Sequence, residues 1–281
     1  MAGGGGREVV GVGMSEVTVA ALHIYPIKSC RGHAVDRVLV TPRGFADDRL
    51  MMITDGAGDF LTQREYPRMA LIEPMLGEEL LTLRAPGMVA LDLPIRMEGS
   101  KRPVVIWRDR CEAVDQGEGV AAWLSEFLGT EARLMRLADD VPRRVDPQFA
   151  RSATDQTSFA DGYPFLLISE ESLADLNRRL ATPLPMNRFR PNIVVRGEVP
   201  FAEDSWRQIR IGKVTFDLVK PCARCQITTI DQETGAVAGK EPLATFATFR
   251  RTPDGKVMFG QNLLSTGAGM IAVGDCVRLE G

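Results

Sequence analysis

Short apolar runs, cut by turn residues at regular spacing, fill the first half of the chain. Residues 17–24 and 35–41 have the length and composition of strands and are followed by turn signals at residues 26–32 and 42–44. The segment Asp-Gly-Ala-Gly at residues 55–58 is a hairpin signal. Further strands are predicted at residues 49–53, 60–62, 80–84, 89–93 and 104–107. Such spacing favours a β-barrel or a β-sandwich.

Helical patterns are confined to a few segments. Residues 120–128 place apolar side chains on one face and end at Gly129, which predicts a helix. Ser169 can cap a second helix that runs to about residue 180. Glutamates in the first turn of this helix suit the helix dipole. The other predicted elements are strands at residues 164–168, 192–195, 209–211, 214–219, 226–230, 257–259 and 275–279 and a short helix at residues 243–249. The second half is therefore mixed and rich in strands.

The polar stretch at residues 139–157 separates the two halves. It contains several prolines and arginines and no clear period, which is typical of a linker or loop. We therefore expect a flexible tail at residues 1–15, a β-barrel-like domain at residues 16–137 and a second domain, a mixed β-barrel with a few helices, at residues 138–281. The expected fold class is α+β and β-rich.

Composition and charge exclude several classes of protein. The chain has 281 residues, of which 44% are apolar and 25% charged, as in an ordinary globular protein. Its net charge of −3 argues against bulk nucleic-acid binding. No apolar run approaches the roughly 18 to 20 residues needed to cross a membrane, and the start lacks the pattern of a secretory signal. Because five cysteines do not form a disulfide framework, we expect a cytoplasmic protein that binds neither membrane nor nucleic acid.

The most informative stretch pairs Cys222 and Cys225 in a C-x-x-C spacing around Arg224. A zinc site needs about four ligands, and the other cysteines and both histidines are distant in sequence. A thioredoxin-like redox pair should open a helix, whereas a strand-like run follows here. The third interpretation is a pair of half-buried thiols beside an exposed arginine. The residues alone leave these three interpretations open.

Basic and turn residues elsewhere could assemble an anion pocket. Lys28 and Ser29 lie in a turn near Gly32, where a hydroxyl, an ammonium and free backbone N–H groups can cradle a phosphate. An arginine beside a thiol also favours the thiolate, which is a soft metal ligand. Further candidates for the same pocket are Arg49, Arg188, Arg190 and Asn192. Together they predict a metal-bearing anionic cofactor.

Three separated motifs resemble the MOSC family. They are Tyr-Pro-Ile-Lys-Ser-Cys-Arg-Gly at residues 25–32, Arg-Phe-Arg-Pro-Asn-Ile-Val-Val at residues 188–195 and Cys-Ala-Arg-Cys-Gln-Ile-Thr-Thr-Ile-Asp at residues 222–231. They are most similar to the mitochondrial amidoxime-reducing component and its bacterial relatives, and the likeness runs from about residue 17 to the C-terminus. The resemblance implies an N-terminal MOSC β-barrel domain, a MOSC domain proper, and a molybdopterin-type molybdenum cofactor between them.

The same resemblance implies roles for individual residues. Cys225 would ligate molybdenum and act in catalysis, and Asp161 would be an acidic catalytic residue beside the cofactor. The residues expected to bind the cofactor are Lys28, Ser29, Arg49, Arg188, Arg190, Asn192, Arg224 and Cys225. The thiols expected to have no such role are those of Cys30, Cys111, Cys222 and Cys276. Arg64 and Arg68 could edge the pocket, but we favour a surface hairpin for them, and we interpret Trp107 as a core or edge aromatic.

The implied activity is that of a molybdenum oxidoreductase that removes oxygen from small N-hydroxylated substrates: amidoximes, hydroxylamines or N-hydroxylated bases. The chain ends at Gly281 without a cysteine cluster for an iron–sulfur centre. We therefore expect a monomer served by a separate electron donor, which is a flavin or iron–sulfur reductase or a cytochrome. The alternative is a carrier of the molybdenum cofactor or of sulfur for metal–sulfur assembly, and the third interpretation is a β-rich protein without a cofactor.

Overall fold

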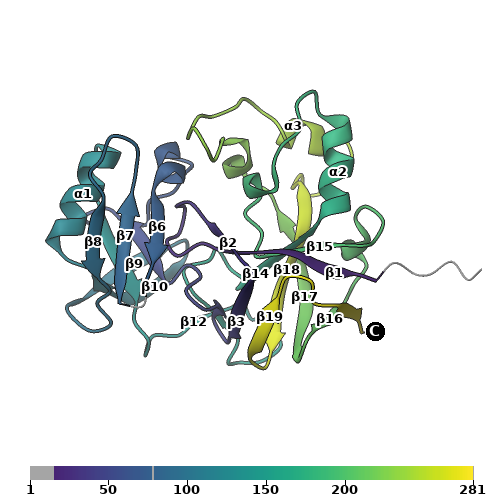
Figure 1. The fold of residues 1–281 in the computed structure, drawn as a ribbon, viewed down its shortest axis with the longest axis horizontal. Helices are drawn as coiled ribbons and strands as arrows, with labels where there is room; N and C mark the ends of the chain where they lie inside the picture. Colours follow the sequence, from purple (N-terminus) through teal and green to yellow (C-terminus); the bar gives the residue numbers. More distant parts are fainter. Residues whose placement is uncertain (1–15, 78, 281) are drawn as a thin grey trace, which may run out of the picture.

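Two lobes lie side by side in the structure, a computed structural model that describes residues 16–77 and 79–280 (Figure 1). The predicted flexible tail at residues 1–15 falls outside these residues. One lobe is built around an eight-stranded sheet, and the other contains a four-stranded and a three-stranded sheet. Only three α-helices occur in the described part of the chain. The prediction of a strand-rich α+β fold with few helices is therefore confirmed.

The eight-stranded sheet combines strands from both ends of the chain. Strand β1 pairs antiparallel with β15, and β14 pairs parallel with β15 and antiparallel with β18. In sheet order the strands are β2 (His33–Val35), β1 (Thr18–Ile24), β15 (Ile193–Arg196), β14 (Phe165–Ser169), β18 (Met258–Thr266), β17 (Val214–Ala223), β16 (Gln208–Ile211) and β20 (Val277–Leu279). Their inward side chains, among them Leu22, Phe165 and Phe216, form one apolar core.

A small sheet next to this core also joins distant parts of the chain. Its order is β19 (Gly269–Ala272), β3 (Arg37–Thr41) and β4 (Gly44–Phe45). Val38, Val40 and Ile271 from this sheet extend the same core. Strands β1 to β4, which come from the first 45 residues, therefore belong to the lobe of the C-terminal half. The boundary near residue 138 stays a prediction, and the strand pairing crosses it.

The second lobe encloses its own core. The four-stranded sheet runs β5 (Met51–Thr54), β11 (Arg133–Leu137), β10 (Asp109–Asp115) and β9 (Lys101–Ile106), and the three-stranded sheet runs β6 (Glu73–Leu76), β7 (Leu80–Arg84) and β8 (Leu91–Pro94). Helix α1 (Glu118–Leu128) buries Trp123, Leu124 and Phe127 against these sheets. It ends at Gly129, whose φ of 71° suits a residue without a Cβ.

Two short helices and a two-stranded sheet complete the described chain. Ser169 caps α2 (Glu170–Arg179) as predicted, because its hydroxyl accepts a hydrogen bond from the N–H of Ser172. Helix α3 (Leu243–Phe246) packs Phe246 into a small aromatic core. Strands β12 (Arg143–Arg144) and β13 (Gln156–Thr157) pair within the stretch interpreted as a linker. That stretch is therefore partly ordered by backbone pairing.

One predicted strand is wrong in a way that matters for the site. Residues 226–230 form the 3₁₀-helix η4 (Gln226–Thr229) instead of a strand. The hydroxyl of Thr228 donates to the carbonyl of Cys225 at 2.9 Å, and the hydroxyl of Thr229 donates to that of Gln226 at 2.8 Å. These side-chain bonds to the backbone compete with a strand ladder and tighten the turn. The chain after Cys225 therefore bends back at once.

Candidate functional site

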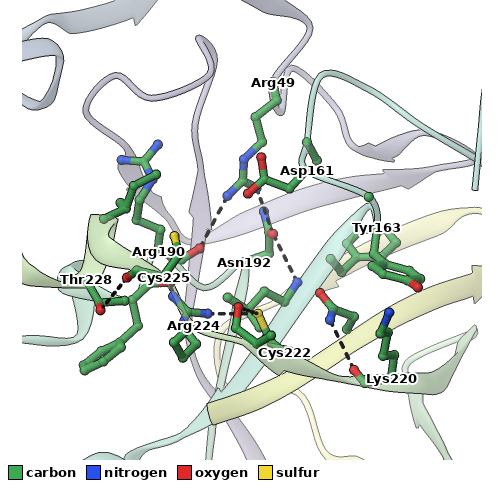
Figure 2. Close-up of a pocket in the computed structure, with 18 of the residues that line it drawn as sticks. Arg49, Asp161, Tyr163, Arg190, Asn192, Lys220, Cys222, Arg224, Cys225 and Thr228 are labelled. Atoms are coloured by element: carbon green, nitrogen blue, oxygen red, sulfur yellow. Dashed lines mark hydrogen bonds between the residues drawn. The ribbon is translucent and has the colours of Figure 1, made fainter. Parts of the chain in front are cut away.

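A cavity of about 280 Å³ lies where the first and second halves of the chain meet. Eight of the nine predicted site residues line it, although they come from five separate segments (Figure 2). They are Lys28, Ser29, Arg49, Asp161, Arg190, Asn192, Arg224 and Cys225. The fold therefore gathers the motifs that the sequence analysis singled out into one place.

Strained backbone marks the walls of this cavity. Ser29, Arg49 and Arg190 have φ values of 66°, 50° and 56°, a left-handed conformation that few residues other than glycine adopt. Each such residue costs on the order of 1 to 3 kcal/mol and persists only where its surroundings impose it. For the loops of Ser29 and Arg49 these surroundings include two cross-bonds, from the N–H of Lys28 to the carbonyl of Met51 at 2.8 Å and from the N–H of Arg49 to that of Tyr25 at 2.7 Å.

Two arginines flank one buried tyrosine. The guanidinium carbons of Arg49 and Arg190 each lie 4.3 Å from the centre of the Tyr25 ring. Arg49 also donates to Asp48 Oδ2 at 2.6 Å and to Asn192 Oδ1 at 2.9 Å. Burial raises the pKa of Tyr25 to about 12 and lowers the pKa of Arg190 to about 10. Two cations are therefore held close together where water is scarce.

Asp161 and Lys28 form an ion pair at the edge of the cavity. Lys28 is buried, whereas 60% of the Asp161 side chain stays exposed. The indole Nε1 of Trp107 also donates to Asp161 Oδ1, at 3.2 Å. The position of Asp161 between the lobes acts to raise its pKa, but the Lys28 ammonium and the Arg64 guanidinium outweigh that effect and hold the pKa well below its ordinary value. The carboxyl is therefore ionised at neutral pH.

Arg143 fixes the loop that presents Asp161. Its buried guanidinium donates to the carbonyls of Ser158 at 2.8 Å and of Asp161 at 2.9 Å, and also to that of Ala160. Its Nε donates to Asp109 Oδ2 at 2.7 Å. Because one planar guanidinium holds three carbonyl groups of this loop, the Asp161 carboxylate has a defined direction.

Each of the two thiols faces a guanidinium. Arg64 NH2 lies 3.2 Å from Cys225 Sγ, and Arg224 NH1 lies 3.1 Å from Cys222 Sγ. Arg224 is itself held by the carbonyl of Phe189 at 2.7 Å. The interpretation of Arg64 as a surface residue is wrong, because the turn at residues 62–66 reaches across to the opposite lobe. Cys222, expected to have no role, lines the same cavity.

A pair of buried glutamines joins the lobes behind this turn. Gln63 Nε2 donates to the carbonyl of Ser29 at 2.6 Å, and Gln232 Nε2 donates to Gln63 Oε1 at 3.0 Å. Arg190 NH1 in turn donates to Gln232 Oε1 at 3.3 Å. Sequence reasoning missed both glutamines, because nothing local distinguishes them from surface amides. Their contacts connect the backbone of Ser29 with the side chain of Arg190.

Arg188 is the one predicted site residue that the structure does not bring into the cavity. Its side chain is buried behind η4, where NH2 donates to Asp231 Oδ2 at 3.0 Å. Its Nε and NH1 atoms have no hydrogen-bond partner within the described chain. The 3₁₀-helix η2 (Met186–Arg188) ends at this residue, so Arg188 and Arg190 point to different sides of the chain.

Positive charge exceeds negative charge among the residues that line the cavity. Five cationic side chains line it together with one carboxylate, that of Asp161. Behind the wall the buried Asp48 carboxylate pairs with Arg49, and the buried Nε of Arg224 has no partner in the described chain. The five cations are Lys28, Arg49, Lys220, Arg190 and Arg224. Buried charges are normally paired. The donor set therefore fits an anionic group such as a phosphate, with the Cys225 thiol available to a soft metal.

Fold and cavity together define a β-rich, two-lobed protein with a cationic, thiol-bearing cleft between segments of both halves. Residues 16–131 match the family described as MOSC N-terminal beta barrel domain, and residues 154–278 match the MOSC domain. The chain is 36% identical over 285 residues to mitochondrial amidoxime-reducing component 1 of Homo sapiens, which covers 94% of this chain and 83% of the relative. The chain therefore belongs to the MOSC family, among the amidoxime-reducing components, and the predicted resemblance is confirmed.

Two other relatives have different names. The chain is 36% identical over 242 residues to mitochondrial amidoxime reducing component 2 of Bos taurus, which covers 83% of this chain and 72% of the relative. It is 32% identical over 267 residues to molybdenum cofactor sulfurase of Oryza sativa subsp. japonica, which covers 88% of this chain and 32% of the relative. The chain thus matches one part of a longer sulfurase and most of an amidoxime-reducing component.

The predicted cytoplasmic location is wrong. The amidoxime-reducing relatives are named as mitochondrial proteins, which contradicts it. The prediction relied on composition and on the absence of a recognisable signal, and neither property measures where a chain is delivered. Within residues 16–77 and 79–280, no helix is long and apolar enough to span a bilayer.

Proposed function

We propose that this protein is a molybdenum-cofactor-dependent oxidoreductase that reduces N-hydroxylated compounds such as amidoximes, hydroxylamines and N-hydroxylated bases. The observation that carries the proposal is the cavity in which the Cys225 thiol and five cations converge. Family membership supports the reaction class, since the chain covers 83% of an amidoxime-reducing component of Homo sapiens at 36% identity.

The residues of the cavity divide into two groups by chemistry. The Cys225 sulfur is the protein ligand of molybdenum, because a thiolate is the soft donor that such a metal takes beside the sulfurs of the molybdopterin form. The anionic phosphate of the pterin is bound by cations and polar groups through charge-assisted hydrogen bonds. The residues proposed for this binding are Lys28, Ser29, Arg49, Arg190, Asn192 and Arg224.

Asp161 orients the substrate. When bound, the cofactor supplies the two-electron reduction that breaks the N–O bond, and the reaction takes up two protons and releases water. Because the pKa of Asp161 lies well below its ordinary value, the carboxylate is ionised at neutral pH and accepts hydrogen bonds. It accepts from the N–H or O–H of the N-hydroxylated group, while Lys28 and Trp107 hold it in place. The protons come from water.

The electrons come from a separate donor protein, of the flavin, iron–sulfur or cytochrome type. The test therefore uses a chemical reductant, so that the identity of the donor does not enter. Cofactor-loaded wild type should convert benzamidoxime to benzamidine over many turnovers, and Cys225→Ala should abolish the reaction. Cys276→Ala is the matched control, because that thiol lies in the described chain away from the cavity. Full turnover by a metal-loaded Cys225→Ala protein would sink the assignment of the thiolate.

A second candidate is a carrier of the molybdenum cofactor or of sulfur. The similarity to a molybdenum cofactor sulfurase favours it, as does the presence of both Cys222 and Cys225 in one cavity. A carrier and an enzyme need the same pocket, but a carrier releases the cofactor and an enzyme releases only the product. A carrier would transfer its cofactor to an apo-enzyme and would not reduce benzamidoxime repeatedly, whereas the proposed oxidoreductase keeps its cofactor through many cycles.

A further inference from the structure

Trp107 adopts a backbone conformation that its side chain disfavours. It is the first of two loop residues between β9 and β10, since Ile106 pairs with Asp109 across the hairpin. Its φ is 57°, in a kind of loop that normally places Asn or Gly at such positions. A bulky residue held in the left-handed region has to be stabilised by its surroundings, and such outliers cluster at functional sites.

The surroundings of Trp107 fix the indole beside the cavity. Its ring lies 5.0 Å from that of Phe60, and its Nε1 donates to Asp161 Oδ1 at 3.2 Å. Although it makes these contacts, 46% of Trp107 remains exposed. A large aromatic surface is therefore held at the rim of a polar cavity, against the one carboxylate among the residues that line it.

Arg64 connects the indole with the Cys225 thiol. Its guanidinium carbon lies 4.8 Å from the centre of the Trp107 ring, while its NH2 reaches Cys225 Sγ at 3.2 Å. Both residues belong to the N-terminal half, and both end on groups of the opposite half, namely Cys225 and Asp161. One continuous set of contacts thus runs from the thiol through Arg64 and Trp107 to the carboxylate.

We infer that Trp107 is a specificity-determining residue that stacks against the planar part of the substrate. This inference rests on the proposed function and names a substrate class within it. An N-hydroxylated group that hydrogen-bonds to Asp161 leaves the rest of its molecule next to the exposed indole. Flat, delocalised groups gain stacking energy on an indole and small aliphatic groups do not. The protein therefore prefers aryl amidoximes and N-hydroxylated heteroaromatic bases to hydroxylamine itself.

The test compares an aromatic with a small substrate in three variants. Trp107→Ala removes the platform, Trp107→Phe keeps a smaller one, and Trp206→Phe is the matched control at a half-buried indole packed on the core of the other lobe. With a chemical reductant, Trp107→Ala should raise the KM for benzamidoxime about tenfold more than it raises the KM for hydroxylamine. The lost hydrogen bond to Asp161 affects both substrates, whereas the lost stacking affects only the aromatic one. Trp107→Phe should recover most of the loss, and Trp206→Phe should match wild type.

Binding measured without turnover separates this inference from the proposed function. Oxidised, cofactor-loaded protein with no reductant is titrated with benzamidoxime by calorimetry, and Trp107→Ala should weaken the Kd about tenfold. An unchanged Kd and an unchanged ratio of the two KM values would overturn the inference while turnover by wild type upholds the function. A defect that appears only with a protein electron donor would also overturn it, because the indole would then be a docking residue. Absence of turnover in wild type defeats the proposed function, and the titration still decides the role of Trp107.

Discussion

Two places in the molecule bury charged groups: the cavity, and a cluster that Glu203 forms with Ser169 and Ser172, here called the Glu203 cluster. Only in the Glu203 cluster does the described part of the protein itself supply all the hydrogen-bond partners of the charged group. Glu203 is 1% exposed and accepts hydrogen bonds from the hydroxyls of Ser169 at 3.0 Å and Ser172 at 2.8 Å and from the N–H of Ser169 at 3.3 Å. No salt bridge reaches it within the described chain. The carboxylate thus ties the loop that carries it to Ser169 and Ser172 at the start of α2 and needs nothing from outside.

In the cavity, by contrast, the protein does not balance the buried charges. Its cations exceed its carboxylates, Arg190 has a pKa lowered to about 10 by burial, and three loop residues have left-handed backbone. Such an arrangement is unfavourable in isolation and becomes favourable when an anion enters. A buried polar group without a partner, and not burial alone, therefore distinguishes a binding site from a structural cluster.

The largest effect is expected where the cavity loses a cation. Arg190→Met should speed dissociation of the cofactor by at least about 30-fold, because truncating one partner of a buried charge pair costs about 2 to 5 kcal/mol. The measurement is the rate at which molybdenum leaves the loaded protein during dilution. Arg196→Met, at an exposed position on β15 outside the cavity, is the control and should retain the metal. Equal rates for the two variants would mean that Arg190 does not hold the anion.

A substitution in the Glu203 cluster should instead lower the stability of the folded protein. Glu203→Ala leaves the hydroxyls of Ser169 and Ser172 without their acceptor and should lower the free energy of unfolding by about 2 to 3 kcal/mol. Urea unfolding measures it. Glu170→Ala, at an exposed glutamate in the first turn of the same helix, should cost less than about 1 kcal/mol. Similar losses in the two variants would contradict the view that Glu203 completes a buried network.

Replacing Arg190 weakens cofactor binding but should stabilise the cofactor-free protein. Arg190→Met removes a desolvated cation that lies beside Arg49, so the empty protein should become about 1 kcal/mol more stable. Gln232 keeps an acceptor role toward Gln63, so no buried amide is stranded. Thermal unfolding of cofactor-free wild type and variant measures the difference. A destabilised variant would show that the cations are already satisfied by the protein.

The smallest effect concerns pH. Burial raises the pKa of Glu203 above its ordinary value, so the folded protein holds a proton that the unfolded chain releases. The stability contributed by Glu203 is therefore present at low pH and falls as pH rises through the folded pKa. Glu203→Gln does not titrate, and its unfolding free energy relative to wild type should therefore rise between pH 4 and pH 7. A difference that stays constant or falls over this range would contradict the direction of the shift.

The sequence predicts where strands lie far better than it predicts which strands pair with each other. The runs at residues 17–24 and 35–41 appear as β1 and as β2 with β3, yet nothing local indicates that β1 joins β15 or that β3 joins β19. Pairing depends on contacts between residues more than 150 positions apart, which no periodicity encodes. Polar strands such as β10, with charged residues along its exposed face, also lack the apolar signal of a strand.

Some residues of the candidate site could likewise be predicted from the sequence, and others could not. Motif residues such as Lys28, Arg190 and Cys225 could be predicted, because their types and spacing carry the chemistry of anion and metal binding. Arg64 and Trp107 could not, since their roles depend on a hairpin and a turn that cross to the other lobe. The one local signal is the bulky pair Trp107 and Arg108 directly after the apolar end of β9, where a tight turn normally takes small residues.

The most direct test of the central claim is the molybdenum content of protein expressed in a host that makes the cofactor. Elemental analysis should find close to one metal per chain in wild type and in Cys276→Ser, and almost none in Cys225→Ser and in the Arg190→Met variant after dilution. Stoichiometric metal in Cys225→Ser, or no metal in wild type under the same conditions, would contradict the claim that this cavity is completed by a molybdenum cofactor.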